Sequence, residues 1–487
     1  MKKKVTGVSI GALLVLAAIP WGVGHLVEHV LCERVERLAA GADAMLRTRL
    51  VRYERGWLTS KAVHRVELAN ATAFEIHHVA DHLPRVGEGW ARVRSVPLLS
   101  ADARALADHY FGSSAPMTAD TVVGFDGSLS VSLRSPAFAK ALTDEPDVRF
   151  TWGGAQGSLH VDSRGSARML FEVPGLAMHG QGVVATFADL RVDGDWRSTA
   201  DAWSGRTSIS VSAIGLSSPE GGARLRRLEA AFEREDLGKT IALSCRVRVG
   251  EGTSLDAGAE DGFRDGAIDI HLDRLGKEAL RTYLERMARL PAALPESEQT
   301  RVNARMALAL LADLLEGAPR LRIERARLTT PNGSFAASGV LAIDPVHAGA
   351  GDRDLLSRLR LDARVEVSAR LLEGWMARDT YRGVSAALLE RSGEVDEQFA
   401  RDLTERFVRE RIEVWTSAGI LAADRDRYRV QIDLARGHLR VNGVPSDALL
   451  PGRSADPGPA PGDIGTTRFV PPRRPSAPVS GQIASVP

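Results

Sequence analysis

The sequence predicts an α+β protein with long antiparallel β-sheets and packed helices, preceded by one transmembrane helix. Three observations predict it: an apolar run near the start, long stretches in which apolar and polar residues alternate, and two stretches of helical periodicity. They divide the chain into a cytoplasmic N-terminus (1–4), a transmembrane anchor (5–27), a strand-rich periplasmic region (28–275), a helix-plus-strand periplasmic region (276–450) and a disordered Pro-rich tail (451–487).

The apolar run spans Val5 to Val27. About 20 apolar residues cross the ~30 Å hydrocarbon core of a bilayer as a helix. Lys2, Lys3 and Lys4 precede the run, so the positive-inside rule predicts a cytoplasmic N-terminus and a periplasmic remainder. A cleaved signal peptide is the alternative, but Ala18 is followed by Ile19 and Pro20, which suits cleavage poorly.

Composition favours a globular protein without a strong overall charge. The 487 residues are 44% hydrophobic and carry a net charge of +1, so no global field attracts nucleic acid. The two cysteines, Cys32 and Cys245, do not make a disulfide scaffold. Cys245 lies among alternating apolar residues, which predicts a buried core thiol, whereas Cys32, beside the membrane, is expected to be the free thiol.

The first half of the chain is expected to be mainly strand. Residues 26–52 should continue the anchor as a helix, and extended structure should begin near Ala62. From there to about residue 275 the dominant period is two, which indicates antiparallel strands with one buried and one wet face. Ile209 and Val211 alternate in this way, but the phase slips at Ile214, which predicts a β-bulge.

The second half mixes both periods. Residues 276–316 predict a helical pair, Asn332-Gly333 predicts a hairpin, and Leu359–Leu371 predicts an unusually long strand. Residues 394–421 predict an amphipathic helix, for which a core-facing stripe is favoured over a ligand groove. That stripe comprises Phe399, Leu403, Phe407, Val408, Ile412 and Trp415. A terminal hairpin should follow, from Tyr428 through a turn at Gly437 to Val441.

Two motifs and the N-terminal apolar run resemble a known family. The first motif reads Tyr53-x-Arg55-Gly56-Trp57-Leu58-Thr59-Ser60-x-Ala62, and the second is the Tyr428 hairpin closing with Gly437-x-Leu439-x-Val441-Asn442-Gly443. Together they are similar to the YdgA-like family of bacterial envelope proteins, whose molecular function is uncharacterised. The resemblance implies a single-span inner-membrane protein with a large periplasmic domain, and it implies no catalytic residues.

The first motif supplies the candidate site residues: Tyr53, Arg55, Gly56, Trp57 and Ser60. An arginine between aromatic side chains can hold a lipid headgroup near a membrane. The alternative is a turn in which Gly56 relieves backbone strain and the aromatic residues pack on the first sheet, and this is favoured.

No motif predicts catalysis, a cofactor or a metal. His25-Leu-Val-Glu28-His29 matches a zinc-binding pattern but lacks a third ligand nearby. His77, His78 and His82 form a loose cluster, but adjacent strand residues point to opposite faces, so a solvated face is expected there.

Two function classes remain open. The first is a non-enzymatic envelope protein that binds or shields lipid in a β groove, suggested by analogy with AsmA-like proteins. The second is a structural or interaction protein that maintains the envelope without a ligand. The expected partners are the inner membrane and either lipid or envelope proteins, with no nucleic acid and no cofactor. The sequence leaves the oligomeric state open.

Overall fold

A computed structural model describes most of the chain. It covers residues 46–288 and 317–446 with internal gaps, chiefly 109–116 and 345–354, together with residues 22–29 and a few isolated positions. The predicted second helix of the 276–316 pair, Cys32 and the predicted tail 451–487 lie largely or wholly outside the described residues.

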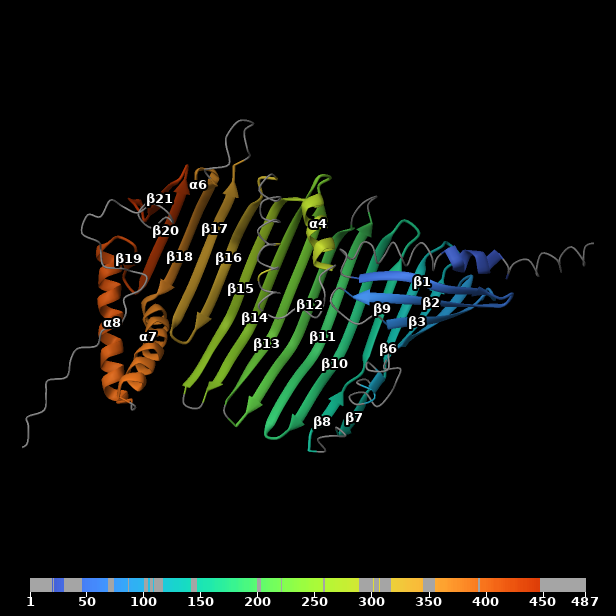
Figure 1. Cartoon of the computed structure of the whole chain (residues 1–487), viewed down its shortest axis with the longest axis horizontal. Helices are drawn as coiled ribbons and strands as arrows, with labels where there is room; N and C mark the ends of the chain where they lie inside the picture. Colours follow the sequence, from blue (N-terminus) through green and yellow to red (C-terminus); the bar gives the residue numbers. More distant parts are fainter. Residues whose placement is uncertain are drawn as a thin grey trace, which may run out of the picture.

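The described residues form mostly one large antiparallel sheet, to which all 22 strands belong (Figure 1). Its N-terminal part comprises β1 (Leu46–Arg55), β2 (Thr59–Leu68), β3 (Phe74–Asp81), β4 (Ala91–Leu98), β5 (Thr118–Val123), β6 (Leu129–Ser135), β7 (Phe138–Ala141), β8 (Arg149–Trp152) and β9 (Ala155–Val161). The strands run in chain order from β1 to β6, and β6 then pairs with β9.

Long strands make up the centre of the sheet. They are β10 (Ser166–Gly180), β11 (Val183–Ser198), β12 (Trp203–Ser218), β13 (Gly221–Asp236), β14 (Thr240–Asp256), β15 (Ala259–Gly276), β16 (Arg320–Thr330) and β17 (Gly333–Ile343). Each pairs with the next in the chain. β10 is long enough to pair with β9 along its first half and with β8 along its second. The pairing of β15 with β16 joins the strands before residue 276 to the strands after residue 317 in the same sheet.

The C-terminal end adds strands and helices. The strands are β18 (Leu359–Ser368), β19 (Ala422–Asp424), β20 (Arg427–Ala435), β21 (His438–Val441) and β22 (Val444–Pro445). The helices are α4 (Lys277–Ala288), α6 (Leu355–Arg358), α7 (Ala369–Ser392) and α8 (Glu397–Ser417). Helices α7 and α8 pack together at the end of the sheet opposite β1–β3 (Figure 1).

The predicted fold class is wrong in two respects. The structure is one dominant sheet rather than several sheets covered by helices, and no helix among the described residues is long and apolar enough to cross a membrane. Residues 22–29, which include the described end of the expected anchor (5–27), form a helix. Its Val23 and Val27 are buried against side chains of the sheet, so this apolar face contacts protein.

Other expectations are met in part. The hairpins after Thr330 and at Gly437 are confirmed, although the first loop consists of Pro331 and Asn332. Helix α4 confirms the first of the expected pair. Residues 46–52 belong to β1 rather than to a helix, because they pair with β2.

The strand predicted over Leu359–Leu371 is shorter than expected. It ends at Ser368, because the amide of Ala369 donates to the carbonyl oxygen of Asp426 (2.7 Å) and α7 begins there. The apolar residue Leu371, which continues the alternation in the sequence, is buried on that helix.

Buried side chains gather at the two ends of the sheet. One cluster joins Val23 and Val27 to the β2–β10 region, a small one contains Val148 and Phe150 beside β7 and β10, and another lies in β18–β21. Among described residues between 174 and 366, the buried hydrophobic side chains are few: Val211, Ile241, Leu275 and Ala318. Within the part of the chain that the structure describes, the centre of the sheet therefore has fewer buried side chains than its ends.

Candidate functional site: an apolar trough

The central strands bring apolar side chains into register. The pairing places one residue from each of ten successive strands side by side across the sheet. These residues are Phe171, Val192, Ile209, Ala230, Val247, Ile268, Ala326, Ala337, Val365 and Val430. All ten are apolar, and all ten are half-buried rather than buried. We call the surface made by this row and its apolar neighbours the apolar trough.

The next row on the same face is also apolar except at its last member. It consists of Val173, Leu190, Val211, Leu228, Val249, Gly266, Leu328, Phe335, Val367 and Tyr428. Nine strand spacings of about 4.8 Å give the trough a length of about 43 Å across the sheet. That is longer than the hydrocarbon core of a bilayer is thick.

The opposite face is polar. The row behind the apolar one reads Glu172, Arg191, Ser210, Glu229, Arg248, Ala267, Arg327, Ala336, Glu366 and Arg429. Arg191 pairs with Glu172 (2.9 Å) and Arg429 with Glu366 (3.2 Å). Because cross-strand charges of opposite sign stabilise a solvated sheet face, water is the natural environment of this side.

Beyond the second apolar row, each of the strands β10–β15 has one residue that is left out of the strand pairing. We call this line of residues the bend. Three of them, Asp189, Arg227 and Asp265, have positive φ (50°, 55° and 60°). The consecutive residues Arg226 and Arg227 both reach Glu251 (3.6 and 3.7 Å), so both lie on one face.

Because two consecutive residues share a face at the bend, the alternation of side chains between the two faces shifts by one residue in all of these strands. As in a β-bulge, two consecutive side chains share a face, and those beyond them change phase. The apolar residues beyond the bend therefore stay on the trough side: Leu176, Phe187, Ile214, Leu225 and Phe263. The phase slip at Ile214 predicted a bulge in one strand, whereas the structure shows neighbouring strands changing phase together without a shift in their pairing.

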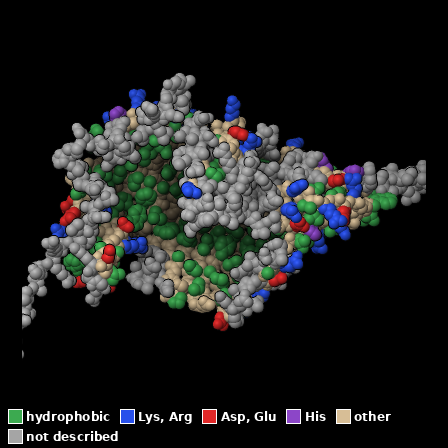
Figure 2. Space-filling model, viewed as in Figure 1, with side chains coloured by type: hydrophobic (Ala, Val, Ile, Leu, Met, Phe, Trp, Pro, Cys, Tyr) green, Lys and Arg blue, Asp and Glu red, His purple; other side chains and the backbone are tan. Residues whose placement is uncertain are grey.

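Helices bound the trough at both ends. Residues 22–29 pack near β1–β4, and α7 lies against β17 and β18, where the rings of Trp375 and Phe335 are 6.0 Å apart. Figure 2 shows the face between them as a hollow in which hydrophobic side chains gather. Cys245, expected in a buried core, is half-buried on this face between Phe232 and Ile270.

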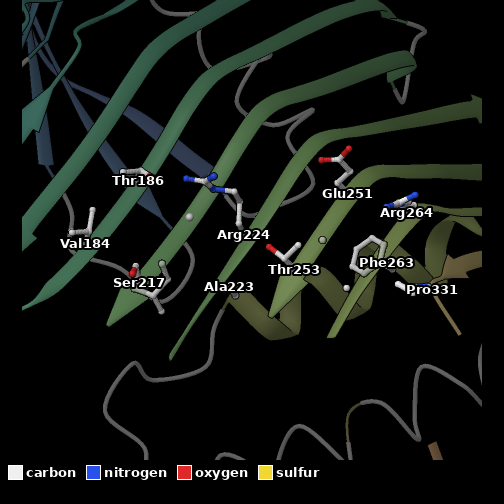
Figure 3. Close-up of a pocket in the computed structure, with 14 residues that line it drawn as sticks. Val184, Thr186, Ser217, Ala223, Arg224, Glu251, Thr253, Phe263, Arg264 and Pro331 are labelled. Atoms are coloured by element: carbon white, nitrogen blue, oxygen red, sulfur yellow. The ribbon is translucent and has the colours of Figure 1, made fainter. Parts of the chain in front are cut away.

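A cavity of about 600 Å³ lies near the ends of β11–β15 (Figure 3). Thr186, Arg224 and Thr253 line it from neighbouring strands together with Glu251 and Arg264. Glu251 is neutralised by Arg226 and Arg227, so Arg224 and Arg264 dominate the charge of this lining. Val184, Phe263 and Pro331 also line the cavity, so its lining is mixed, whereas the trough offers a far longer surface of one chemical character.

The predicted site residues lie at the β1–β2 hairpin and hold the N-terminal helix. The Tyr53 hydroxyl donates to the Gly24 carbonyl (3.0 Å), and Arg55 pairs with Glu28 and lies 2.9 Å from His25 Nε2. A Cβ at Gly56 would lie 2.4 Å from the Thr59 carbonyl oxygen, so close approach explains this glycine. Ser60 is buried, and Trp57 is exposed rather than packed on the sheet.

The histidines that the sequence grouped together have different environments. His77 is exposed as expected, but His78 and His82 are buried, because the helix of residues 22–29 covers that side of β3. Burial, with smaller effects of His64 and His77, lowers the pKa of His78 from 6.5 to about 3. Its Nδ1 lies 2.8 Å from the Ser95 hydroxyl. Within the described residues no group of three or more histidine, cysteine or acidic side chains could hold a metal ion.

Helix α8 also presents a different face from the one expected. Val408 and Ile412 of the predicted stripe are buried, but Ala400 and Thr404 complete the buried face. Phe399 and Phe407 are exposed, because the packed face is rotated from the predicted one.

Comparison with known proteins shows the family but not an activity. No curated protein and no solved structure matches the chain. A family model described as bacterial protein of unknown function (DUF945) matches residues 1–447. The narrower resemblance to YdgA-like proteins stays a prediction. Because the match spans most of the sequence, the chain belongs to the bacterial family of unknown function DUF945.

Proposed function

We propose that the protein binds the acyl chains of lipids, or ligands of equal apolarity, along the apolar trough. The observation that carries the proposal is the row of ten apolar side chains, all half-buried, on a sheet whose other face is charged. Apolar surface of this extent left in water is unfavourable by about 25 cal/mol per Å². A ligand with an apolar body would remove that surface from water.

The shape of the trough favours long or multiple chains. Its ten strands extend about 43 Å, and its lining has one character throughout, so a chain gains the same type of contact at every strand. A compact ligand would use only part of this length. The polar row on the opposite face can stay hydrated while the trough is filled.

We propose further that the protein lies in the bacterial cell envelope, in contact with the inner membrane and with its large sheet on the periplasmic side. Membrane-derived acyl chains are abundant there, and the family is bacterial. We propose a carrier or shield for lipid rather than an enzyme, without a cofactor.

Two neighbouring alanines test the proposal. Ala230 lies in the trough row between Ile209 and Val247, whereas Ala231 lies on the polar face between Ser208 and Arg246, and both are half-buried. We expect lipid to be extracted from the purified wild-type protein. Ala230→Asp should lower the amount recovered by tenfold or more, on the order of 1.4 kcal/mol in affinity, because the carboxylate would be desolvated by a bound chain.

The matched control is Ala231→Asp, which should retain wild-type lipid because its carboxylate meets water and Arg246. Circular dichroism should show that both variants are folded. Wild-type protein free of lipid, or equal lipid loss in the two folded variants, would contradict binding in the trough.

A second candidate, a structural or interaction protein without a ligand, is favoured by helix α8. Phe399, Phe407 and Val414 are exposed on this helix. Exposed apolar side chains grouped on one element are typical of protein–protein contacts. Envelope proteins captured through α8, with no lipid in the wild-type protein, would favour this alternative.

A further inference from the structure

The end of the sheet formed by β1–β3 carries an exposed apolar group at a turn. Trp57 and Leu58, at the β1–β2 turn, are 63% and 49% exposed, and Leu83, just after β3, is 48% exposed. The backbone joins them: the His82 amide donates to the Leu58 carbonyl (2.8 Å), and His82 Nδ1 lies 3.2 Å from the Trp57 carbonyl oxygen. We call Trp57, Leu58 and Leu83 the apolar apex.

The apex is fixed rather than loosely tethered. Gly56 donates its amide to the Thr59 carbonyl (2.9 Å), which closes the turn, and Arg55 beside it pairs with Glu28 of the N-terminal helix. Ser60 and His82, next to the exposed residues, are buried beneath it. Three large apolar side chains are therefore presented to solvent on a support that includes the first helix.

We propose that the apolar apex inserts into a lipid surface at the level of the headgroups. Tryptophan combines an apolar ring with a polar N–H and is enriched at this depth in membranes. The apex is a turn, so it can enter a soft lipid layer and needs no complementary groove. This docking is separate from binding in the apolar trough and does not depend on it.

The surroundings of the apex fit a lipid surface better than a protein pocket. Lys61 follows the turn and is exposed, whereas Arg85, two residues beyond Leu83, pairs with Asp81 (3.3 Å). Cations beside interfacial aromatic residues interact favourably with lipid phosphates.

A position-specific probe tests the docking in the full chain. In protein carrying Cys32→Ser and Cys245→Ser, Leu83→Cys would be labelled with the environment-sensitive nitrobenzoxadiazole group. Vesicles of phosphatidylethanolamine and phosphatidylglycerol should raise the fluorescence of this label several-fold and shift it to the blue. The matched control is Leu237→Cys in the same background, because Leu237 is a leucine of similar exposure (52%) on the β13–β14 hairpin.

The label at position 237 should not respond. Adding Trp57→Ala and Leu58→Ala to the Leu83→Cys protein should remove most of the response at position 83. Three results would overturn the docking: no response at position 83 in protein that floats with the vesicles, equal responses at both positions, or protein that does not bind vesicles. None of them bears on lipid in the trough, which is measured by extraction.

Discussion

Single side chains in the N-terminal part of the sheet differ sharply from their neighbours. His77 and His78 are adjacent on β3, yet His77 is exposed and His78 is buried against Ser95. The sequence alone predicts that the two point to opposite faces, but not which face a helix covers. The partner of Arg55 in the β1–β2 hairpin could not be predicted from the sequence either, because it is Glu28, on a helix 27 positions away in the chain.

His78 should make the protein sensitive to acid. Its pKa is about 3 in the folded protein and 6.5 when unperturbed, so below pH 6.5 the unfolded chain binds a proton that the folded protein does not. This contribution to stability is present in full above that pH and falls by about 1.4 kcal/mol per pH unit as the pH drops toward the folded pKa. Urea unfolding at a series of pH values measures the slope.

The variant His78→Asn should remove this part of the acid dependence, while His77→Asn, at the exposed neighbour, should retain it. If wild type and His78→Asn lose stability equally as the pH falls, His78 does not set the acid response.

At the scale of elements, local signals predicted the hairpins and helices α4 and α8, but they missed α7 and did not predict packing. The turn at Gly437 and helix α8 follow from short-range chemistry. The exposed side of α8 does not, because the neighbours of a helix, rather than its own period, decide which face is covered. The same holds for residues 22–29: their apolarity is real, but the sheet covers Val23 and Val27.

The start of α8 depends on one side chain. The Asp396 carboxylate accepts a hydrogen bond from the amide of Phe399 (3.1 Å), which satisfies one of the free donors of the first turn. Asp396→Ala should therefore lower the free energy of unfolding by about 1 kcal/mol. The control, Asp402→Ala, removes an exposed carboxylate in the second turn of the same helix, which accepts only from the Gln398 side chain, and should cost less. Equal losses in the two variants would show that the cap does not stabilise the protein.

At the scale of the whole molecule, the trough is a product of register. Alternation in individual strands, such as Ile241–Val249, can be seen in the sequence. What it cannot show is that ten strands align their apolar residues in one row, or that β10–β15 change phase together at Asp189, Arg227 and Asp265. The aligned row and the shared change of phase both depend on which strands pair and in what register, and the sequence does not give these pairings. Among the described residues, the buried side chains therefore lie mainly toward the two ends, and few lie in the centre.

The most direct test of lipid in the trough is the reactivity of Cys245. This thiol lies in the trough between Phe232 and Ile270, whereas Ser244 precedes it on the polar face between Glu233 and His271. In Cys32→Ser protein, the rate at which Cys245 reacts with a water-soluble aromatic disulfide would be measured before and after lipid is loaded. The control is Cys245→Ser combined with Ser244→Cys in the same background.

Binding in the trough predicts that lipid slows the reaction at position 245 by tenfold or more, on the order of a 1.4 kcal/mol difference, and leaves position 244 unchanged. Equal rates at position 245 with and without bound lipid, or equal slowing at both positions, would contradict it.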